Sequence, residues 1–467
     1  MKPYRLFFLF LVVIFAVKAS GQTFTELYGF TRNQSLPDGA NPQGGVLLSG
    51  NTLYGTTFNG GAKNAGMVYS LSSTGGVLTA IHSFTNGSFG GFNPSGDLVL
   101  SGGTLFGTTG SGGKYSGGTV YSIFTNGGGF TVLHDFTNSP DGAQPTIGLI
   151  LSGTRLYGAT YTGGRTNSSG AVAGTLFSIN TDGSGYTNFY NFTGGDDGRG
   201  PVGLVLAKGT LYGITVNATY VNSDGLVHWG TVFSVSTNGS GFKPLYSFTN
   251  TPDGSEGSGL CLLGNTLYGT TLYGGASHTG TLFAINTNGS NYSILHDFSG
   301  VNPDGATPVS VIAAGNVLYG ATKTGGTGGY GTVYSYDTGG SSFSTLYSFT
   351  DYPDGMAPMS DLLLSGNLLY GTSDMDGSGG YGTVFSLSLP PPPPSITNII
   401  YALNGQVTLG VLSPANSTNI LLVATNLAPP VAWLPLSTNI AGVNGSLQFV
   451  DTNANNFPTR FYRAAKQ

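Results

Sequence analysis

The pentapeptide LYGTT, residues 53–57, decides the fold of this chain because the sequence repeats it. The variants LFGTT, LYGAT, LYGIT, LYGTT, LYGAT and LYGTS follow it. Their aromatic residues are Tyr54, Phe106, Tyr157, Tyr212, Tyr268, Tyr319 and Tyr370, so successive spacings are 52, 51, 55, 56, 51 and 51 residues. A fixed period of this size is typical of a propeller, a solenoid or another repeat array.

Each period contains four strand-like runs, of which LYGTT is the second. In one repeat the third run is GTVFSV, residues 230–235, and the fourth is FKPLYSF, residues 242–248. The runs are rich in β-branched and aromatic residues, and Gly, Asn and Ser bound them. Val232 and Phe233 point to opposite faces of their strand, so both faces are bulky. Such a strand suits a sheet that lies between two similar sheets, as in a propeller blade.

A parallel β-helix is the main alternative for this period. However, short turns such as SGNT, residues 49–52, join the first run to the second. Turns of this length make hairpins, so neighbouring strands run antiparallel. Four antiparallel strands in each repeat favour the blade over the β-helix coil.

The number of runs predicts how the repeats close. A fourth-type run, FTELYGF at residues 24–30, stands alone at the start, whereas the last repeat stops after its third run at Pro390–Pro394. We therefore predict an all-β fold, a seven-bladed β-propeller of four-stranded blades whose ring is closed by the N-terminal strand. The glycine in mid-strand indicates close approach of a neighbour that the sequence does not identify.

The unit LYGTT…GG…GTVFSI…F..LYSF…PDG..P resembles the GloVer tandem repeat of secreted bacterial proteins. The resemblance covers residues 24–389 and implies the repeat architecture; it implies no particular activity.

The two ends of the chain differ from the repeats. Residues 1–21 have a basic start, an apolar run and small residues at the end, which predicts a cleaved signal peptide and a secreted or cell-surface protein. Cleavage of the signal peptide removes Lys2, Arg5 and Lys18, so the formal net charge changes from −5 to −8. Residues 22–389 are then the propeller and 390–394 a stiff polyproline linker.

Residues 395–467 contain five short strand-like runs, QVTLGVL, NILLVAT, VAWLPLS, GSLQFVD and RFYRAA. They resemble a small C-terminal β-sandwich module of similar secreted proteins. This module is either a cap or spacer, or an attachment or sorting module.

Composition limits the partners. Charged residues make up 7% of the chain and are on balance acidic, which argues against nucleic acid and anionic lipid. No segment after the signal is apolar enough to span a membrane. Cys261 is the sole cysteine, so no disulfide forms within the chain, and it stands where other repeats carry apolar residues. We expect a monomer.

The usual signs of catalysis have structural explanations. His82, His134 and His296 occupy a position that is Tyr in other repeats, which favours packing over chemistry. Six aspartates precede glycine in the loops between repeats and suit turns better than metal ligands, because single carboxylates spread around a ring do not converge. They are Asp38, Asp141, Asp197, Asp253, Asp304 and Asp354. We expect no metal, no cofactor and no catalytic residues, although carboxylates paired across distant loops stay open.

Two repeats break the regularity. The loop after LYGTT has eight residues in five repeats, but it spans residues 161–173 in the third and 216–229 in the fourth. Loops that break a repeat are where function gathers. With the connecting segment TGGDDGRGP, they predict a ligand site made of Arg165, Asp196, Asp197, Arg199, Tyr220, Asp224, His228 and Trp229.

Aromatic rings beside carboxylates and arginines suit a glycan or a polar peptide. The sequence thus favours a non-catalytic scaffold that binds an extracellular glycan or protein. The alternatives are a carbohydrate-active hydrolase or lyase and a purely structural surface protein.

Overall fold

The computed structural model describes residues 22–32, 38–85, 87, 90–165, 172–217, 229–390, 395–401, 406–413, 417–425, 431, 433–456 and 460–466. The chain divides into two compact units, one of residues 22–388 and one that contains residues 389–467. The predicted signal peptide, residues 1–21, lies outside the described residues. No helix in the described ranges combines the length and apolarity needed to cross a bilayer.

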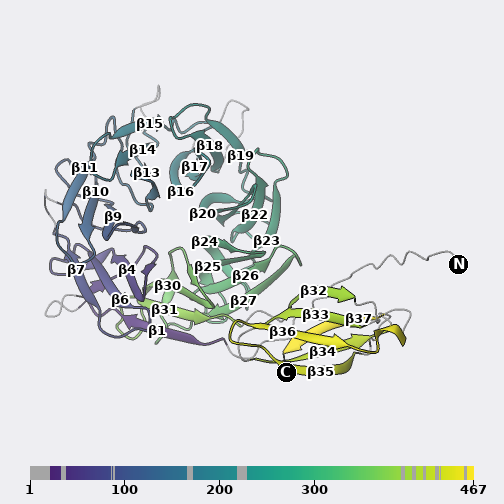
Figure 1. Cartoon of the computed structure of the whole chain (residues 1–467). Helices are drawn as coiled ribbons and strands as arrows, with labels where there is room; N and C mark the ends of the chain where they lie inside the picture. Colours follow the sequence, from purple (N-terminus) through teal and green to yellow (C-terminus); the bar gives the residue numbers. More distant parts are fainter. Residues whose placement is uncertain are drawn as a thin grey trace. The chain divides into compact units, whose positions relative to one another are not determined.

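Residues 22–388 form repeated antiparallel sheets. Over its described residues this unit has six four-stranded sheets, one five-stranded sheet and a pair of two-residue strands. We number the larger sheets 1 to 7 in the order in which their second strands occur in the chain. They follow one another around a common centre, and the labelled first strands β16 (Arg199–Ala207), β20 (Ser255–Leu263) and β24 (Gly305–Ala314) lie innermost in their sheets (Figure 1).

Each strand position recurs in every sheet. The first strands are β3 (Leu47–Ser49), β8 (Val99–Ser101), β12 (Ile150–Ser152), β16 (Arg199–Ala207), β20 (Ser255–Leu263), β24 (Gly305–Ala314) and β29 (Leu363–Ser365). The second strands are β4 (Thr52–Thr57), β9 (Thr104–Thr109), β13 (Arg155–Thr160), β17 (Thr210–Asn217), β21 (Thr266–Tyr273), β25 (Val317–Gly325) and β30 (Leu368–Met375). The third strands are β6 (Met67–Ser72), β10 (Thr119–Phe124), β14 (Thr175–Asn180), β18 (Thr231–Ser236), β22 (Thr281–Asn286), β26 (Thr332–Asp337) and β31 (Thr383–Ser388).

The fourth strands are β7 (Thr79–Ser83), β11 (Thr131–Asp135), β15 (Thr187–Asn191), β19 (Lys243–Ser247), β23 (Ser293–Asp297), β27 (Ser342–Ser348) and β1 (Phe24–Gly29). In sheet 7 the short strand β28 (Met356–Pro358) also pairs with β30. Strands β2 (Gly39–Ala40) and β5 (Asn59–Gly60) form the small pair. All these pairings are antiparallel, so the β-helix alternative is wrong.

The glycine of LYG lies directly opposite an aromatic residue of the third strand. Gly213 pairs with Phe233, and a Cβ at Gly213 would lie 2.2 Å from the ring Cζ. Gly55 faces Tyr69 in the same way, with the hydroxyl 2.4 Å from that Cβ position. The ring therefore occupies the space of the missing side chain, and it is the neighbour that the sequence left unidentified.

The two faces of each third strand pack on different sheets, as the alternation of Val232 and Phe233 predicted. Both side chains are fully buried, Val232 in the core between sheets 4 and 5 and Phe233 in the core between sheets 3 and 4. The phenylalanine after each fourth strand packs edge-on against the third-strand ring of the following sheet; for Phe192 and Phe233 the centroids are 5.3 Å apart. Aromatic pairs of this geometry stabilise beyond their buried area.

Strand β1 belongs to the last sheet. It pairs antiparallel with β31, and the register shifts between Glu26 and Tyr28 as it does between third and fourth strands elsewhere. The chain is thus all-β with repeated, propeller-like sheets.

The second unit is a separate small β structure. Its described residues contain two three-stranded sheets, one of β32 (Ser395–Tyr401), β33 (Val407–Leu412) and β36 (Ser446–Asp451), the other of β35 (Leu434–Ile440), β34 (Thr418–Ala424) and β37 (Phe461–Lys466). A short 3-10 helix, η1 (Ala454–Asn456), follows β36. Strand β32 is additional to the five predicted runs.

Candidate functional site

The aspartates of the Pro-Asp-Gly loops are engaged in a hydrogen-bond network that recurs between sheets. Asp354 accepts hydrogen bonds from the Tyr347 hydroxyl at 2.6 Å and from the N–H and hydroxyl of Thr350 at 3.0 and 2.9 Å. The carboxylate ties the loop to the fourth strand that precedes it. This geometry favours the turn interpretation of these aspartates, because their oxygens face local donors.

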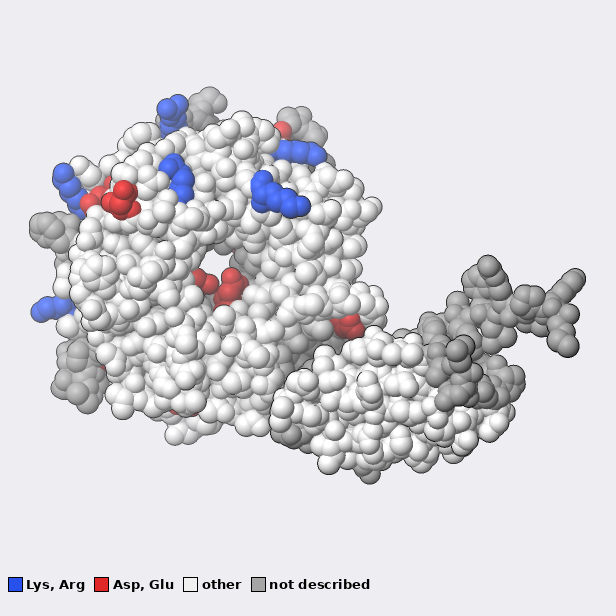
Figure 2. Space-filling model, in the orientation of Figure 1, with Lys and Arg blue, Asp and Glu red and all other residues white. Residues whose placement is uncertain are grey.

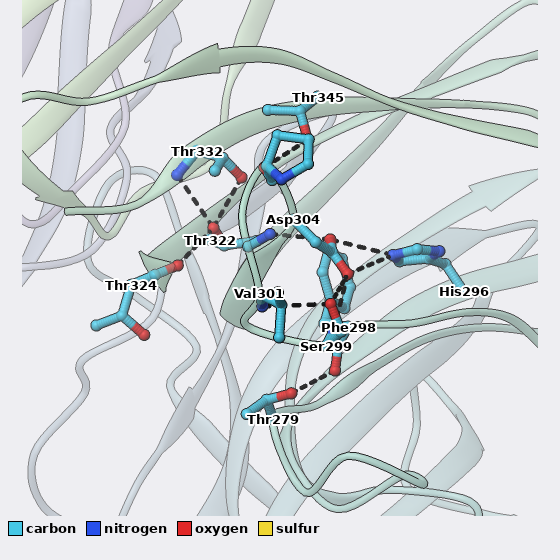
Figure 3. A network of polar contacts seen from close by, with 12 residues as sticks. Thr279, His296, Phe298, Ser299, Val301, Asp304, Thr322, Thr324, Thr332 and Thr345 are labelled. Atoms are coloured by element: carbon cyan, nitrogen blue, oxygen red, sulfur yellow. Dashed lines mark hydrogen bonds and ion pairs between the residues drawn. The ribbon is translucent and has the colours of Figure 1, made fainter. Parts of the chain in front are cut away.

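At His296 the network resembles a catalytic triad in composition only. Asp304 accepts from His296 Nε2 at 3.2 Å and from the N–H and hydroxyl of Ser299 at 2.8 and 2.9 Å (Figure 3). Burial acts against the charged form, but these hydrogen bonds outweigh it and lower the pKa of Asp304. The carboxylate therefore lies between histidine and hydroxyl, whereas a triad needs the histidine in the middle to take the hydroxyl proton.

The fourth-strand histidines also stack on the next sheet. His134 lies 3.6 Å from the ring centroid of Tyr186 with an interplanar angle of 6°, and His82 lies 4.0 Å from that of Phe130. Burial lowers the pKa of both imidazoles, so they stay neutral at pH 7. Tyr190 and Tyr246 make the same stacks on Phe242 and Tyr292. These contacts agree with the packing interpretation of the histidines.

The structure describes five of the eight residues of the predicted loop site. Tyr220, Asp224 and His228 lie outside the described residues. Asp197 is buried and accepts hydrogen bonds from Tyr190 at 3.1 Å and from the N–H of Thr193 at 2.8 Å, so it is one of the loop-fixing aspartates.

The other four residues are spread over several positions. Arg165 and Asp196 are exposed, and the N–H of Arg165 donates to Asn191. Arg199 is half-buried in β16, opposite Asn217. Trp229 is half-buried against the core between sheets 4 and 5. The site itself stays a prediction.

A cavity of about 260 Å³ lies at the centre of the sheets and is lined by residues of all seven. Figure 2 shows a central opening with acidic side chains at its wall. The two acidic lining residues are Asp97 and Asp361, beside the hydroxyl residues Ser95, Thr146, Ser258 and Ser360.

The two aspartates flank Gly45 of sheet 1. The Gly45 N–H donates to Oδ1 of Asp97 at 2.6 Å, and a Cβ at Gly45 would lie 2.9 Å from the Asp361 carbonyl oxygen. Burial raises the pKa of both carboxyls, and the charge of Asp97 raises that of Asp361 further. Asp361 nevertheless stays open to the cavity and Asp97 is half-buried, so water in the cavity moderates this effect. The pair can therefore bind a proton near neutral pH or accept hydrogen bonds from a cation.

The sequence carries a signal for this pair that lies outside the usual motifs. Immediately before the first apolar residue of each first run, the sheets carry Gly45, Asp97, Gly148, Gly203, Gly259, Ser310 and Asp361 in turn. Two carboxylates at a position that is otherwise glycine or serine mark an exception to the repeat.

Several solved structures resemble this chain at low identity. An oligogalacturonate lyase in complex with manganese is 12% identical with a TM-score of 0.48, over 79% of this chain and 91% of the lyase. The computationally designed Ika8 protein is 12% identical with a TM-score of 0.42, over 77% of this chain and 98% of its own. No curated protein matches the sequence.

The sequence model of the Gloeobacter/Verrucomicrobia repeat matches residues 11–225 and 166–316. These overlapping matches cover more than half of the chain and confirm the resemblance to the GloVer repeat. The chain therefore belongs to the Gloeobacter/Verrucomicrobia repeat family.

Proposed function

We propose that residues 22–388 are a seven-bladed propeller ring, closed by β1, that serves as a secreted, non-catalytic scaffold and binds an extracellular glycan or protein on its loop-bearing face. Closure is supported by contacts that recur at the junction of sheets 7 and 1. Phe30, after β1, packs edge-on against Tyr69 at 5.5 Å and 65°, as Phe248 packs against Phe283 at 5.3 Å and 64°.

A backbone hydrogen bond supports the same closure. The N–H of Glu256 donates to the Trp229 carbonyl at 2.7 Å, and that of Thr307 to the Thr279 carbonyl at 2.8 Å, each from a residue with positive φ. At the junction of sheets 7 and 1 the N–H of Asn41, also at positive φ, donates to the Tyr381 carbonyl at 2.8 Å. If sheets 7 and 1 meet through the same contacts as the other neighbouring sheets, no sheet edge is left open between the first and the last sheet.

The observation that carries the binding function is the distribution of exposed aromatic rings over the loops. The connections after second and fourth strands emerge at the same end of antiparallel sheets. Exposed tyrosines occur in or beside these connections in sheets 2, 3, 5 and 7 and before sheet 7: Tyr115, Tyr161, Tyr273, Tyr381 and Tyr352. Exposed rings among hydroxyl and amide groups suit stacking against sugars or contact with a polar protein surface.

The test is a glycan array and a polysaccharide retention assay with the secreted chain. Tyr115→Ala, Tyr273→Ala and Tyr352→Ala, alone and together, should weaken retention. Phe124→Ala is the matched control, because Phe124 is 49% exposed, close to the 48% of Tyr115, but ends a third strand at the opposite end of its sheet. Product release from a bound polysaccharide would instead indicate a hydrolase or lyase. If the triple variant retains polysaccharide as well as the unmodified chain does, the loop-bearing face is not the binding surface.

A further inference from the structure

Positive charge is unevenly distributed over the loops that follow the second strands. Residues 22–388 contain nine Lys and Arg but nineteen Asp and Glu. Three of the nine cations lie in this loop in three consecutive sheets: Lys63 in sheet 1, Lys114 in sheet 2 and Arg165 in sheet 3. The same loop has no Lys or Arg in sheets 4 to 7. We call these three residues, one per sheet on the loop-bearing face, the basic arc.

The side chains of the basic arc are exposed, and no carboxylate in the described parts of the chain forms an ion pair with them. Asp135 is the acidic residue that acts on Lys114, but its Oδ1 accepts a hydrogen bond from the backbone N–H of Lys114 at 2.7 Å and so fixes the loop. Lys323, in β25 of sheet 6, differs: burial raises the pKa of Asp374, and the charge of Lys323 lowers it. The cations of the basic arc are therefore available for a ligand.

A fourth cation lies beside the basic arc. Arg32 is exposed, and its Nε donates a hydrogen bond to Oδ1 of Asn64, the residue after Lys63, at 3.1 Å. Its guanidinium also lies 5.5 Å from the ring centroid of Tyr381. Like charges at neighbouring positions repel each other, and an anion that meets both relieves this repulsion. The sheet 1 end of the basic arc thus brings two cations together.

Within the proposed function, on which this rests, we propose that the basic arc binds an anionic polysaccharide, a polymer of sugars that carry carboxylate or sulfate groups. A polymer with repeated negative charge can meet the cations of successive sheets in turn, because Lys and Arg both bind such oxygens. Tyr115 and Tyr161, which are 48% and 37% exposed, lie in the loops of sheets 2 and 3 and provide faces for the sugar rings.

The net negative charge of residues 22–388 does not oppose this binding. Exposed charges that are further apart than a Debye length of about 8 Å are largely screened at physiological ionic strength. Several aspartates, such as Asp141 and Asp253, are also buried and accept hydrogen bonds from the N–H groups of their own loops. The charge close to the basic arc therefore decides which ligand it attracts.

Retention of the whole secreted chain on immobilised polymers tests the proposal. The probes are carboxymethyl dextran and dextran sulfate, with unmodified dextran as their neutral counterpart. An exposed ion pair changes an affinity by up to about fivefold. We therefore expect Lys63→Gln, Lys114→Gln and Arg165→Gln each to weaken retention on the anionic polymers, and the triple variant to weaken it by roughly tenfold. Added salt should weaken it as well, because it screens exposed charges.

The matched control is Lys208→Gln. Lys208 is an exposed cation at the turn between β16 and β17, at the opposite end of its sheet from the loop-bearing face, so its replacement should leave retention unchanged. The substitutions in the basic arc keep the backbone N–H groups of Lys114 and Arg165 that hold the loops. A loss of retention therefore reports on the charge of the side chain.

Equal retention on dextran and its anionic derivatives, absence of retention on both anionic polymers, or an effect of Lys208→Gln as large as that of Lys114→Gln would overturn the proposal. Binding to phosphatidylglycerol vesicles but to neither anionic polymer would also overturn it and indicate a lipid surface. The alanine variants of the exposed tyrosines test the proposed function separately. If they weaken retention on a neutral glycan while the triple variant of the basic arc does not, the proposed function stands and the anionic ligand class is wrong.

Discussion

Replacing Gly213 by alanine should destabilise the unit of residues 22–388, although the substitution adds only one methyl group. The new Cβ would lie 2.2 Å from Cζ and 2.7 Å from Cε1 of Phe233, and 2.8 Å from a methyl of Leu204. Favourable contact between carbon atoms needs about 3.5–4.0 Å. Either strand β17 or the phenyl ring of Phe233 must therefore move.

The side chains around Phe233 oppose movement of its phenyl ring. Phe233 is fully buried, and its centroid lies 5.3 Å from that of Phe192 and 5.4 Å from that of Phe242. Overpacking of a well-filled core costs about 1–3 kcal/mol, whereas the entropy that alanine removes from the unfolded chain returns only about 0.4–1 kcal/mol. We expect Gly213→Ala to lower the free energy of unfolding by about 1–2 kcal/mol.

Denaturant unfolding in a Trp433→Phe background measures this, because Trp229 is then the single tryptophan and packs against the core between sheets 4 and 5. Gly195→Ala is the matched control: its φ is not positive and the nearest atom to its Cβ position is 3.5 Å away. A double-mutant cycle with Phe233→Leu isolates the clash. If Gly213→Ala costs the same with leucine at position 233, the ring is not the cause and the reasoning is wrong.

Further predictions use the same unfolding assay. Asp354→Ala removes the charged acceptor shared by the half-buried Tyr347 and the exposed Thr350, and it should cost about 1.5–3 kcal/mol. The exposed-turn variant Asp182→Ala should cost less than about 1 kcal/mol; equal costs would contradict the role of the network. Phe30→Ala and Phe248→Ala should each cost about 3–5 kcal/mol, since both side chains are fully buried in equivalent edge-on contacts; a much smaller cost at Phe30 would indicate an open junction. Because the pKa of Asp361 is raised, the folded protein binds a proton at this carboxyl more tightly than the unfolded chain does. Protonation of Asp361 therefore stabilises the fold in mild acid, and this contribution is lost as pH rises through the raised pKa. Asp361→Asn should therefore stabilise the protein more at pH 8 than at pH 5. The difference should be on the order of 1 kcal/mol, because water in the cavity screens the charge; the opposite trend would contradict the raised pKa.

The repeat made the strands predictable from sequence, because each run recurs with the same period and turn residues. The alternation of Val232 and Phe233 also predicted which faces are buried, since a side chain in a strand must point to one face or the other. The partner of the LYG glycine was not predictable in this way. It depends on the register between second and third strands, which the loop lengths alone do not set.

The candidate sites were harder to predict. Loop length drew attention to residues 161–173 and 216–229, whereas the acidic pair of the cavity comes from runs that look regular. Asp97 and Asp361 are 264 positions apart in the sequence and meet only because sheets 2 and 7 flank sheet 1. Asp197 was predicted to bind ligand, but its position relative to Thr193 and Tyr190 is that of the other loop-fixing aspartates.

Hydrogen exchange of the amides of β31 in the unmodified chain tests the closed ring most directly. In a ring closed by β1, β31 is an inner strand with β30 on one side and β1 on the other, like β14 and β22 in sheets 3 and 5. All its paired amides should then be protected as strongly as those of β14 and β22. Rapid exchange of alternate amides along β31, with the others protected, would show an unpaired edge and contradict the closure of the ring by the N-terminal strand.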